Sequence, residues 1–540
     1  MRAFLASSIG VACAAALVLP LSLPAAAAAD DLSLSGSTQS LPLRPLSADR
    51  STVRTAQGLP ERDVRPFSLV GVVWDDPDDE LHGTVQVRTR ATAGGWSGWQ
   101  AVETHNHDHA PDPGTPERES GTVRGSTAPL WVGASDGIEV RVRAEAPRAG
   151  AAVEPLPQGM RVELVDPGDD PAPEDDTAAH GPQLAADTDT DTDTDPGGEA
   201  GSGTEAGAGT GGGGGGETDP EVETDPDTGT GTDNGTDTDT GTDNGTDTDT
   251  GTGTDPGSGT DPDADPDPDA DPDPDVDPDQ GADPDQGTDT GQTTSAGLTL
   301  EEAAASAVNA DLAELGALEI SELTKAETEA NLVGFAKPYI GPRPRIITRK
   351  GWGADEKLRE RNFVYTKSVQ AAFVHHSATG NNYTCKQAPS VLRSIYRYHV
   401  QSSGWRDFGY NFAIDKCGNI YEGRAGGVAK AVLGAHTLGF NTNTMGIAVL
   451  GTYSSSTPPA AAVTGIAKLT AWKLGLYGKN PKGKSTLVSG GGNRYKKGTK
   501  VKLNTISGHR DGFATECPGA KLYGKLGTAR SASAKYQGRT

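Results

Sequence analysis

The stretch ISGHRDGFATECPG (residues 506–519) carries His509 eight residues before Cys517. An imidazole and a thiol offered from the two ends of one loop make half of a zinc site. A second stretch, FVHHSAT (residues 373–379), ends an apolar run with two histidines, His375 and His376, and this pair can supply a further ligand. Two histidines and one cysteine leave the fourth tetrahedral position open, which is typical of a catalytic zinc rather than a structural one.

The charge of the chain is divided between an acidic N-terminal part and a basic C-terminal part. The 540 residues carry a net charge of −28, yet residues 343–540 hold 31 Lys and Arg against 8 Asp and Glu, a balance of +23. The rest of the chain therefore carries −51. One chain thus joins two parts of opposite electrostatic character.

Residues 1–29 have the order of a secretory signal. Arg2 is followed by an apolar stretch and by a run of alanines that ends before Asp30. A basic end, an apolar core and small residues at a cleavage site are the features of such a signal. A membrane anchor is the alternative, and Pro20 and Pro24 disfavour it because they interrupt the apolar run. We therefore expect a secreted protein with no stable membrane span in its mature form.

Residues 65–166 predict a small all-β, sandwich-like domain. Short β-branched runs such as GTVQVRTR (residues 83–90) and GIEVRVRA (residues 137–144) alternate with period two and are separated by Gly, Pro and Asp. Each such strand would bury one face.

One loop of this domain, HNHDH, carries histidines at positions 105, 107 and 109. Three histidines so close together could bind a metal. The loop is polar, however, and the sequence shows no ordered partner for it, so we expect it to be solvated rather than to form a site.

Residues 167–296 have no apolar face to bury. Asp-Thr, Gly-Thr and Asp-Pro units repeat there, so burial cannot offset the entropy of ordering the backbone. We expect a long disordered acidic linker. Calcium sites are the alternative, but a calcium loop needs a glycine at its sharp turn and a bidentate glutamate at its end. Residues 299–342 follow as a helical connector, in which Thr299 and Glu302 form a capping box.

Residues 343–530 predict an α/β domain with a mixed central sheet flanked by helices. The apolar run that leads to the paired histidines is a strand, and TMGIAVLG (residues 444–451) is short enough to be a buried one. GYNFAIDKCGNIYEG (residues 409–423) has the pattern of a hairpin. Helices are expected from Pro389 and over residues 460–476.

Six separated motifs of this domain keep the order and spacing of a known family. They are RIITRKGWGADE, VHHSAT, GYNFAID, YEGRAGG, GAHTLGFNTNTMGIAVLGTY and GHRDGFATECPG. In these motifs the chain resembles the peptidoglycan recognition proteins and zinc N-acetylmuramoyl-L-alanine amidases (type 2 amidases). The resemblance covers residues 343–530, about a third of the chain. It implies that the zinc ligands are His375, His509 and Cys517.

The resemblance also implies roles for residues around the zinc. Tyr410 and Thr515 would be catalytic, because each offers an uncharged hydrogen-bond donor to the oxyanion that forms during attack on an amide. Arg424, His436 and Trp405 would contact the glycan and the stem peptide of the substrate. A core role for Tyr410 and a loop cap for Thr515 are the alternatives.

Two further histidines are expected to be structural. His376 follows a ligand on a strand, so its side chain points to the opposite face. His399 lies on the buried side of a helix, where a histidine is more often satisfied by the core than used by a site.

Removal of the signal leaves three cysteines in the chain. With Cys517 on zinc, Cys385 and Cys417 remain as a pair in an oxidising compartment. We therefore expect a disulfide between these two.

The predicted function is hydrolysis of the amide bond between N-acetylmuramic acid and L-alanine in peptidoglycan, by a secreted amidase with Zn²⁺ as cofactor. A non-catalytic peptidoglycan-binding or -sensing wall protein is the alternative; it would have no need of an open zinc site. Anionic wall polymers are candidate partners of the basic domain, although solvated lysine-rich loops explain the same residues. We expect a monomer, extracellular or associated with the cell wall, and no nucleic-acid partner.

Overall fold

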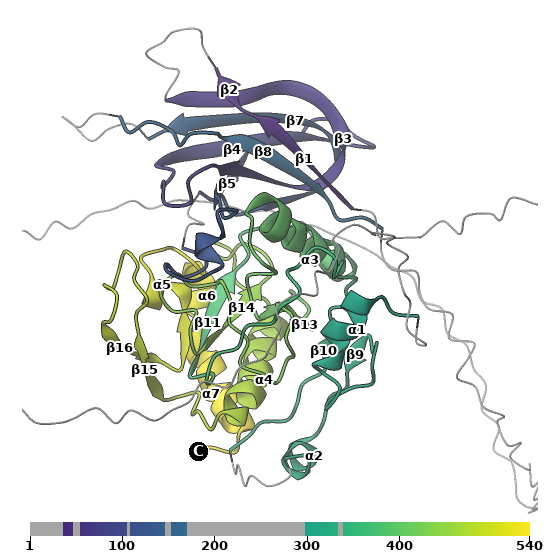
Figure 1. Ribbon diagram of the computed structural model, residues 1–540, viewed down its shortest axis with the longest axis vertical. Helices are drawn as coiled ribbons and strands as arrows, with labels where there is room; N and C mark the ends of the chain where they lie inside the picture. The colour runs from purple at the N-terminus through teal and green to yellow at the C-terminus, as the bar shows by residue number, and fades with distance from the viewer. Residues whose placement is uncertain (1–35, 47–54, 105–107, 146–152, 170–296, 333–338) are drawn as a thin grey trace, which may run out of the picture. The chain divides into compact units, whose positions relative to one another are not determined.

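The computed structural model describes most of the chain outside its acidic middle (Figure 1), namely residues 36–46, 55–104, 108–145, 153–169, 297–332 and 339–540. All of these residues fall within one compact unit. The predicted signal (residues 1–29) and almost all of the predicted linker (residues 167–296) lie outside the described residues. None of the described helices is long and apolar enough to cross a lipid bilayer.

Eight strands of the N-terminal part form one antiparallel sheet. They are β1 (Ser37–Pro42), β2 (Arg44–Pro45), β3 (Ala56–Trp74), β4 (Gly83–Ala91), β5 (Gln100–Val102), β6 (Gly125–Ser126), β7 (Leu130–Ala144) and β8 (Arg161–Asp166). The order along the sheet is β1-β8-β3-β7-β4-β5, and β2 and β6 each pair with β3. The predicted all-β domain is confirmed, and its sheet also includes strands that lie before residue 65.

Successive residues of a strand point to opposite faces, and this alternation builds the core of the sheet. Val85 and Val87 of β4 are buried, whereas Gln86 between them is only half-buried. Val87 lies opposite Val140 of β7, and both belong to the apolar cluster of this domain. Register shifts between β3 and β7 accompany the strong curvature of β3 (Figure 1), as β-bulges do.

A mixed seven-stranded sheet forms the centre of the C-terminal part. Its strands are β9 (Glu319–Ile320), β10 (Ile346–Ile347), β11 (Ala371–His376), β12 (Phe412–Ile414), β13 (Ile420–Glu422), β14 (Thr444–Val449) and β17 (Ile506–Gly508), in the order β17-β11-β14-β12-β13-β10-β9. The strands from β17 to β12 are parallel, and β12 and β13 form the predicted antiparallel hairpin. A separate ribbon pairs β15 (Lys484–Val488) with β16 (Lys500–Asn504).

Helices cover both faces of this sheet. Residues of α4 (Ala460–Leu476) and α7 (Leu526–Tyr536) form one apolar cluster with Ile447 of β14, and residues of α3 (Ala388–Arg397) form another with Ala448, the next residue of the same strand. The adjacent residues point to opposite faces, so the two clusters lie on opposite sides. The α/β prediction is thereby confirmed. The shorter helices are α1 (Leu300–Ala307), α2 (Lys325–Ala330), α5 (His509–Gly512) and α6 (Ala520–Tyr523), and a π-helical turn over Tyr398–Ser402 extends α3.

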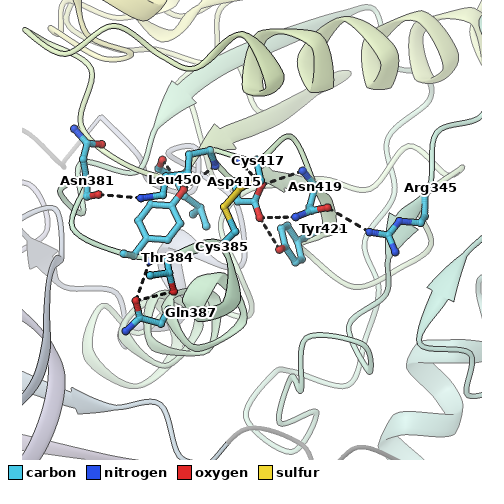
Figure 2. Close-up of a disulfide and its surroundings, with 12 residues drawn as sticks. Arg345, Asn381, Thr384, Cys385, Gln387, Asp415, Cys417, Asn419, Tyr421 and Leu450 are labelled. Carbon is cyan, nitrogen blue, oxygen red and sulfur yellow. Dashed lines mark hydrogen bonds between the residues drawn. A yellow bond between two sulfur atoms is a disulfide. The ribbon is translucent and has the colours of Figure 1, made fainter. Parts of the chain in front are cut away.

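A disulfide joins Cys385 to Cys417, as the sequence predicts. Cys385 lies in the turn that leads into α3, and Cys417 lies in the turn between β12 and β13 (Figure 2). The Asp415 carboxylate shapes this second turn by accepting hydrogen bonds from the backbone N–H groups of Cys417 and Asn419, both at 2.9 Å. The disulfide therefore ties the start of α3 to the hairpin formed by β12 and β13.

The N-terminal sheet and the C-terminal domain share an apolar cluster. Leu69 and Val73 of β3 belong to the cluster that contains the side chains of α3, whereas Val70 and Val72 belong to the core of the N-terminal sheet. Alternation thus buries both faces of the end of β3. Gly71 makes the close approach possible, because a Cβ atom there would lie 2.4 Å from the hydroxyl of Tyr398. That hydroxyl donates hydrogen bonds to backbone carbonyls of the N-terminal domain at Val72 and Thr127.

Candidate metal centre

Two parallel strands bring the first two predicted ligands together. β11 and β17 are neighbouring parallel strands, with Val374 opposite Gly508. The next residues, His375 and His509, therefore lie side by side at the same end of the sheet. Val374 points into the cluster of α4, and alternation therefore directs His375 to the other face. The Nδ1 atoms of the two histidines lie 3.1 Å apart.

The loop after β17 returns Cys517 to the same place. The backbone N–H of Arg510 donates to the carbonyl of Cys517 at 3.0 Å, and the N–H of Gly508 donates to the Asp511 carboxylate at 2.9 Å. The loop therefore closes on itself. Cys517 Sγ lies 3.7 Å from His375 Nδ1, so the structure brings the three predicted ligands together.

A fourth donor comes from the N-terminal domain. His109 Nε2 lies 3.2 Å from His375 Nδ1, 3.2 Å from His509 Nδ1 and 3.6 Å from Cys517 Sγ. The four donor atoms all lie within 4.8 Å of one another. The expectation of a solvated histidine loop is therefore wrong for His109, which is only 5% exposed because its partners come from the other domain. The histidines at positions 105 and 107 lie outside the described residues.

The donor set fits a zinc ion. Imidazole nitrogens at about 2.0–2.1 Å and a thiolate at about 2.3 Å in tetrahedral geometry stand roughly 3.4 Å (N to N) and 3.6 Å (N to S) apart. The N···N separations of 3.1–3.2 Å and the N···S separations of 3.6–3.7 Å are close to these values. Catalytic zinc sites have three protein ligands and one open position, and the third imidazole brings the number of protein ligands here to four.

Asp108 orients the histidine of the N-terminal domain. Its Oδ1 lies 2.8 Å from His109 Nδ1. A carboxylate only accepts hydrogen bonds, so Nδ1 donates the proton and the lone pair of Nε2 faces the other three donors. Carboxylate–histidine pairs of this kind fix the tautomer of metal-binding histidines and increase their basicity.

Burial sets the protonation of His375 and Cys517. It lowers the pKa of His375 well below the ordinary value, and His509 and His109 add to the effect, so the imidazole is neutral. Burial also raises the pKa of the Cys517 thiol well above its usual range, with Asp108 and Glu103 contributing in the same direction. A bound cation reverses this second shift, because a coordinating thiol is deprotonated.

Of the two predicted catalytic residues, only Tyr410 lies against the donor set. Its ring centroid is 5.3 Å from that of His375 and 5.8 Å from that of His109. Burial raises the pKa of its phenol well above the ordinary value, so the group stays a neutral donor. Thr515 is half-buried, and its hydroxyl accepts a hydrogen bond from the N–H of Cys517 at 3.2 Å. This is the loop-cap contact, and a catalytic role for Thr515 stays a prediction.

The three predicted substrate contacts are buried in the full chain. Arg424, His436 and Trp405 are 7%, 0% and 4% exposed. The Arg424 guanidinium donates two hydrogen bonds of 2.9 Å to Glu117 of the N-terminal domain. The Trp405 ring stacks on His399, with centroids 4.4 Å apart. Their roles in substrate binding therefore stay predictions, and none of them is open to a large ligand in this arrangement.

Two histidines predicted to be structural lie apart from the donors. His376 points to the opposite face of β11, where its Nδ1 accepts a hydrogen bond from the N–H of Tyr453 at 3.2 Å. His399 Nδ1 accepts from the N–H of Gly409 at 3.1 Å. Neither ring is among the four grouped donors, and their structural roles stay predictions.

Asp112, three residues after His109, binds the loop that carries His436. Its Oδ1 accepts hydrogen bonds from the backbone N–H of Gly439 and from the Asn441 side chain, both at 2.7 Å. Burial raises the pKa of the Asp112 carboxyl from 3.8 to about 6, with Glu117 acting in the same direction, although the hydrogen bonds from Gly439 and Asn441 oppose the shift. The folded chain therefore holds this proton more tightly than the unfolded chain does.

The stabilising effect of protonated Asp112 is fully present below about pH 4 and is lost as the pH rises through about 6. We therefore expect Asp112→Asn, which keeps an acceptor oxygen and removes the charge, to gain stability relative to the natural chain as the pH rises. The shift of about two pKa units corresponds to roughly 3 kcal/mol in the free energy of unfolding between about pH 4 and pH 7.5. Urea unfolding of both chains across this range measures it, and a difference that does not change with pH would contradict it.

Comparison with known proteins covers both parts of the chain. Residues 365–520 match the family model for N-acetylmuramoyl-L-alanine amidase. Residues 24–172 match a family model described as Rv3811 N-terminal galactose-binding domain-like. The two matches fall on the mixed sheet and on the antiparallel sheet respectively.

Individual relatives match about a third of the chain. Peptidoglycan-recognition protein SC2 of Drosophila melanogaster is 32% identical over 185 residues, which are 34% of this chain and 85% of that protein. N-acetylmuramoyl-L-alanine amidase of Homo sapiens is 29% identical over 214 residues, which are 39% of this chain and 32% of that protein. The solved structure of peptidoglycan recognition protein-LE in complex with tracheal cytotoxin is 28% identical, with 34% of this chain and 92% of that chain covered and a TM-score of 0.26.

The match to SC2 spans most of the relative at 32% identity, and the amidase family model covers residues 365–520 of this chain. That part also holds His375, His509 and Cys517, three of the four grouped donors. The chain therefore belongs to the family of peptidoglycan recognition proteins and type 2 N-acetylmuramoyl-L-alanine amidases, with a function in peptidoglycan hydrolysis or binding.

Proposed function

We propose that the chain is a secreted, zinc-dependent amidase that hydrolyses the bond between N-acetylmuramic acid and L-alanine in peptidoglycan. The observation that supports this most directly is the convergence of His375, His509 and Cys517 beside the phenol of Tyr410. A receptor that only binds peptidoglycan has no need of three buried metal donors with a neutral hydrogen-bond donor beside them.

His375, His509 and Cys517 would hold the zinc ion. When bound, zinc supplies Lewis-acid chemistry and makes water a good nucleophile near neutral pH. The lactyl carbonyl of muramic acid would be the group attacked. Tyr410 lies against the ligands, and its neutral phenol is suited to donate a hydrogen bond to the carbonyl oxygen as negative charge develops there. Thr515, two residues before Cys517, would add a second donor if its hydroxyl turns away from the loop-cap contact.

Peptidoglycan binding without hydrolysis is the second candidate function. The position of His109 favours it, because four protein ligands leave no open position, as in structural zinc sites. In this alternative, zinc would only stabilise the loop between His509 and Cys517, and the domain would act as a receptor.

Digestion of purified peptidoglycan distinguishes the two functions. The full chain and a His109→Ala variant are each incubated with peptidoglycan, with and without a zinc chelator, and the soluble products are analysed by mass spectrometry. An amidase releases stem peptides with a free L-alanine amino group, and the chelator abolishes their release. If neither chain releases such peptides while both still sediment with peptidoglycan, the binding function replaces the amidase.

Removal of the Tyr410 hydroxyl should impair turnover without loss of metal. In the His109→Ala chain, Tyr410→Phe is expected to lower kcat by about 100- to 1,000-fold, the usual cost of losing one oxyanion donor. Zinc content should stay at one ion per chain, because the phenol is not a ligand. Tyr477→Phe is the matched control, since the Tyr477 hydroxyl bonds the carbonyl of Ala429 outside the site. An equal loss in both variants would show that the effect is structural.

The remaining parts of the proposal concern the surroundings of the protein. Peptidoglycan, as glycan with attached stem peptide, is the proposed partner, and the extracellular space or the cell wall is the proposed location. The +23 balance of residues 343–540 favours an additional attraction to anionic wall polymers. A salt titration of binding to walls with and without these polymers tests it, because screening weakens such attraction.

A further inference from the structure

We propose that His109 is the fourth ligand of the zinc centre, and that the N-terminal domain thereby keeps the proposed amidase closed until it is displaced. The inference rests on the proposed function, because closure matters for hydrolysis only if the centre is catalytic. His109 Nε2 lies 3.2–3.6 Å from the other three donor atoms, so it fills the position that a catalytic zinc leaves open for water and substrate.

The histidine is held in the conformation of a ligand. Its Nδ1 donates to the Asp108 carboxylate, which directs the Nε2 lone pair toward His375 and His509. The backbone of the same segment is also fixed, because the carbonyl of Asp108 accepts a hydrogen bond from the N–H of Leu438 at 2.9 Å. A histidine with no role as a ligand would not require either of these two contacts.

The residues that follow His109 bind the loop that carries His436. The carbonyl of Ala110 and the carboxylate of Asp112 both accept hydrogen bonds from the side-chain amide of Asn441. Asn441 Oδ1 in turn accepts from the backbone N–H groups of His436 and Thr437. The N-terminal domain therefore covers the loop of His436, which the sequence implies as a substrate contact.

A carboxylate of the N-terminal domain occupies another predicted substrate contact. Glu117 makes a two-pronged ion pair with Arg424, and both side chains are buried. Arginine recognises carboxylates in this geometry, so an acidic group of a substrate would have to displace Glu117 to reach the guanidinium. The same segment, residues 108–117, thus blocks both the fourth ligand position of the zinc and the predicted substrate contact at Arg424.

The closure involves the whole domain rather than one loop. Leu69 and Val73 pack into the cluster of α3, and Tyr398 bonds the backbone of the N-terminal domain next to Gly71. Substrate access therefore requires the N-terminal domain to move as a unit. Disruption of a contact remote from the zinc, such as that between Gly71 and Tyr398, should then open the centre as removal of His109 does.

X-ray absorption at the zinc edge counts the ligands directly. The full chain loaded with zinc should show three imidazoles and one sulfur, and the His109→Ala chain should show two imidazoles, one sulfur and one additional light atom. The measurement on the natural chain needs no variant to fold. A count of only two imidazoles around the zinc of the natural chain would overturn the proposal whatever the activity of the protein.

Access to the fourth position is tested with cobalt in place of zinc and azide as the probe. Azide should change the visible spectrum of the cobalt-loaded His109→Ala chain and leave that of the natural chain unchanged. Gly71→Val, whose side chain would collide with Tyr398, should open the site to azide although every ligand is kept. His82→Ala is the matched control, because His82 is an exposed histidine of the same domain that pairs with Glu80 and Glu154. Azide binding to the natural chain as tight as to His109→Ala would contradict closure.

Hydrolysis of a soluble muropeptide separates this proposal from the proposed function. The His109→Ala and Gly71→Val chains should turn over at least about tenfold faster than the natural chain, as expected if fewer than one natural chain in ten is open. Measurable hydrolysis at equal rates in natural and variant chains would overturn closure. If no chain is active but the spectra still report three imidazoles and a blocked fourth position, closure stands and the amidase assignment fails.

Discussion

Replacement of Cys517 by alanine is expected to lower the zinc affinity of the full chain by at least about 100-fold. Loss of an outer-sphere partner already costs about 10- to 100-fold in metal affinity, and a direct ligand costs more. Cys517 is also the one grouped donor that can carry a negative charge, and it is completely buried. Without it, three neutral imidazoles would surround a divalent ion in a site that water does not reach, and burial of an uncompensated charge is strongly unfavourable.

Competition with a chromophoric chelator measures this affinity. His82→Ala serves as the control, because its side chain lies on the surface and should not affect zinc. Cys517→Ala should also remove any sulfur signal from the zinc-edge spectrum. Unchanged affinity, or a sulfur ligand that persists in the variant, would remove Cys517 from the centre and with it the proposed mechanism.

Replacement of Glu117 by alanine is expected to lower the free energy of unfolding by about 3–5 kcal/mol, the cost of breaking a buried ion pair from one side. The Arg424 guanidinium would stay buried beside Phe408, whose carbonyl it bonds, with no carboxylate of the N-terminal domain to balance its charge. The first transition in urea unfolding should report the loss, because Glu117 joins the N-terminal domain to the C-terminal one.

The exposed neighbour Glu119 supplies the matched control, and Glu119→Ala should change stability by less than about 0.5 kcal/mol. A double variant, Glu117→Met with Arg424→Met, should recover most of the loss, because apolar side chains of similar size often replace a buried ion pair without cost. If the losses at Glu117 and Arg424 simply add, the two side chains do not interact in solution and the contact between the domains is not the one described.

Much of the C-terminal domain was predictable from local pattern. The helix over residues 460–476 was expected with the same bounds that the structure shows for α4. The strand that carries His375 and the hairpin around Asp415 also lie where the pattern indicates. Apolar periodicity and turn residues act over a few positions, so they are visible in the chain itself. The short strand β9, which pairs with β10, left no such signal because it is only two residues long.

The three predicted ligands could be found for a similar reason. His509 and Cys517 lie on one loop, and His375 is the last residue but one of β11, which is parallel to the strand before that loop. Chemistry and spacing pointed to the loop and to the histidine pair, and the family resemblance chose His375 from that pair before any tertiary contact was known. The pairing of Cys385 with Cys417 followed from assigning Cys517 to the metal, and the structure confirms it.

The sequence by itself determined the two fold classes and, with the family resemblance, predicted the three donors that the C-terminal domain brings together. Only the tertiary structure decided that His109 joins those donors, that Glu117 pairs with Arg424 and that Asp112 binds Asn441. His109 and His509 are separated by 400 positions along the chain. Local pattern shows that a face or a loop must be buried, but the surface that buries it depends on how two domains pack. A histidine in a polar loop therefore looked solvated until its partners from the other domain were in place.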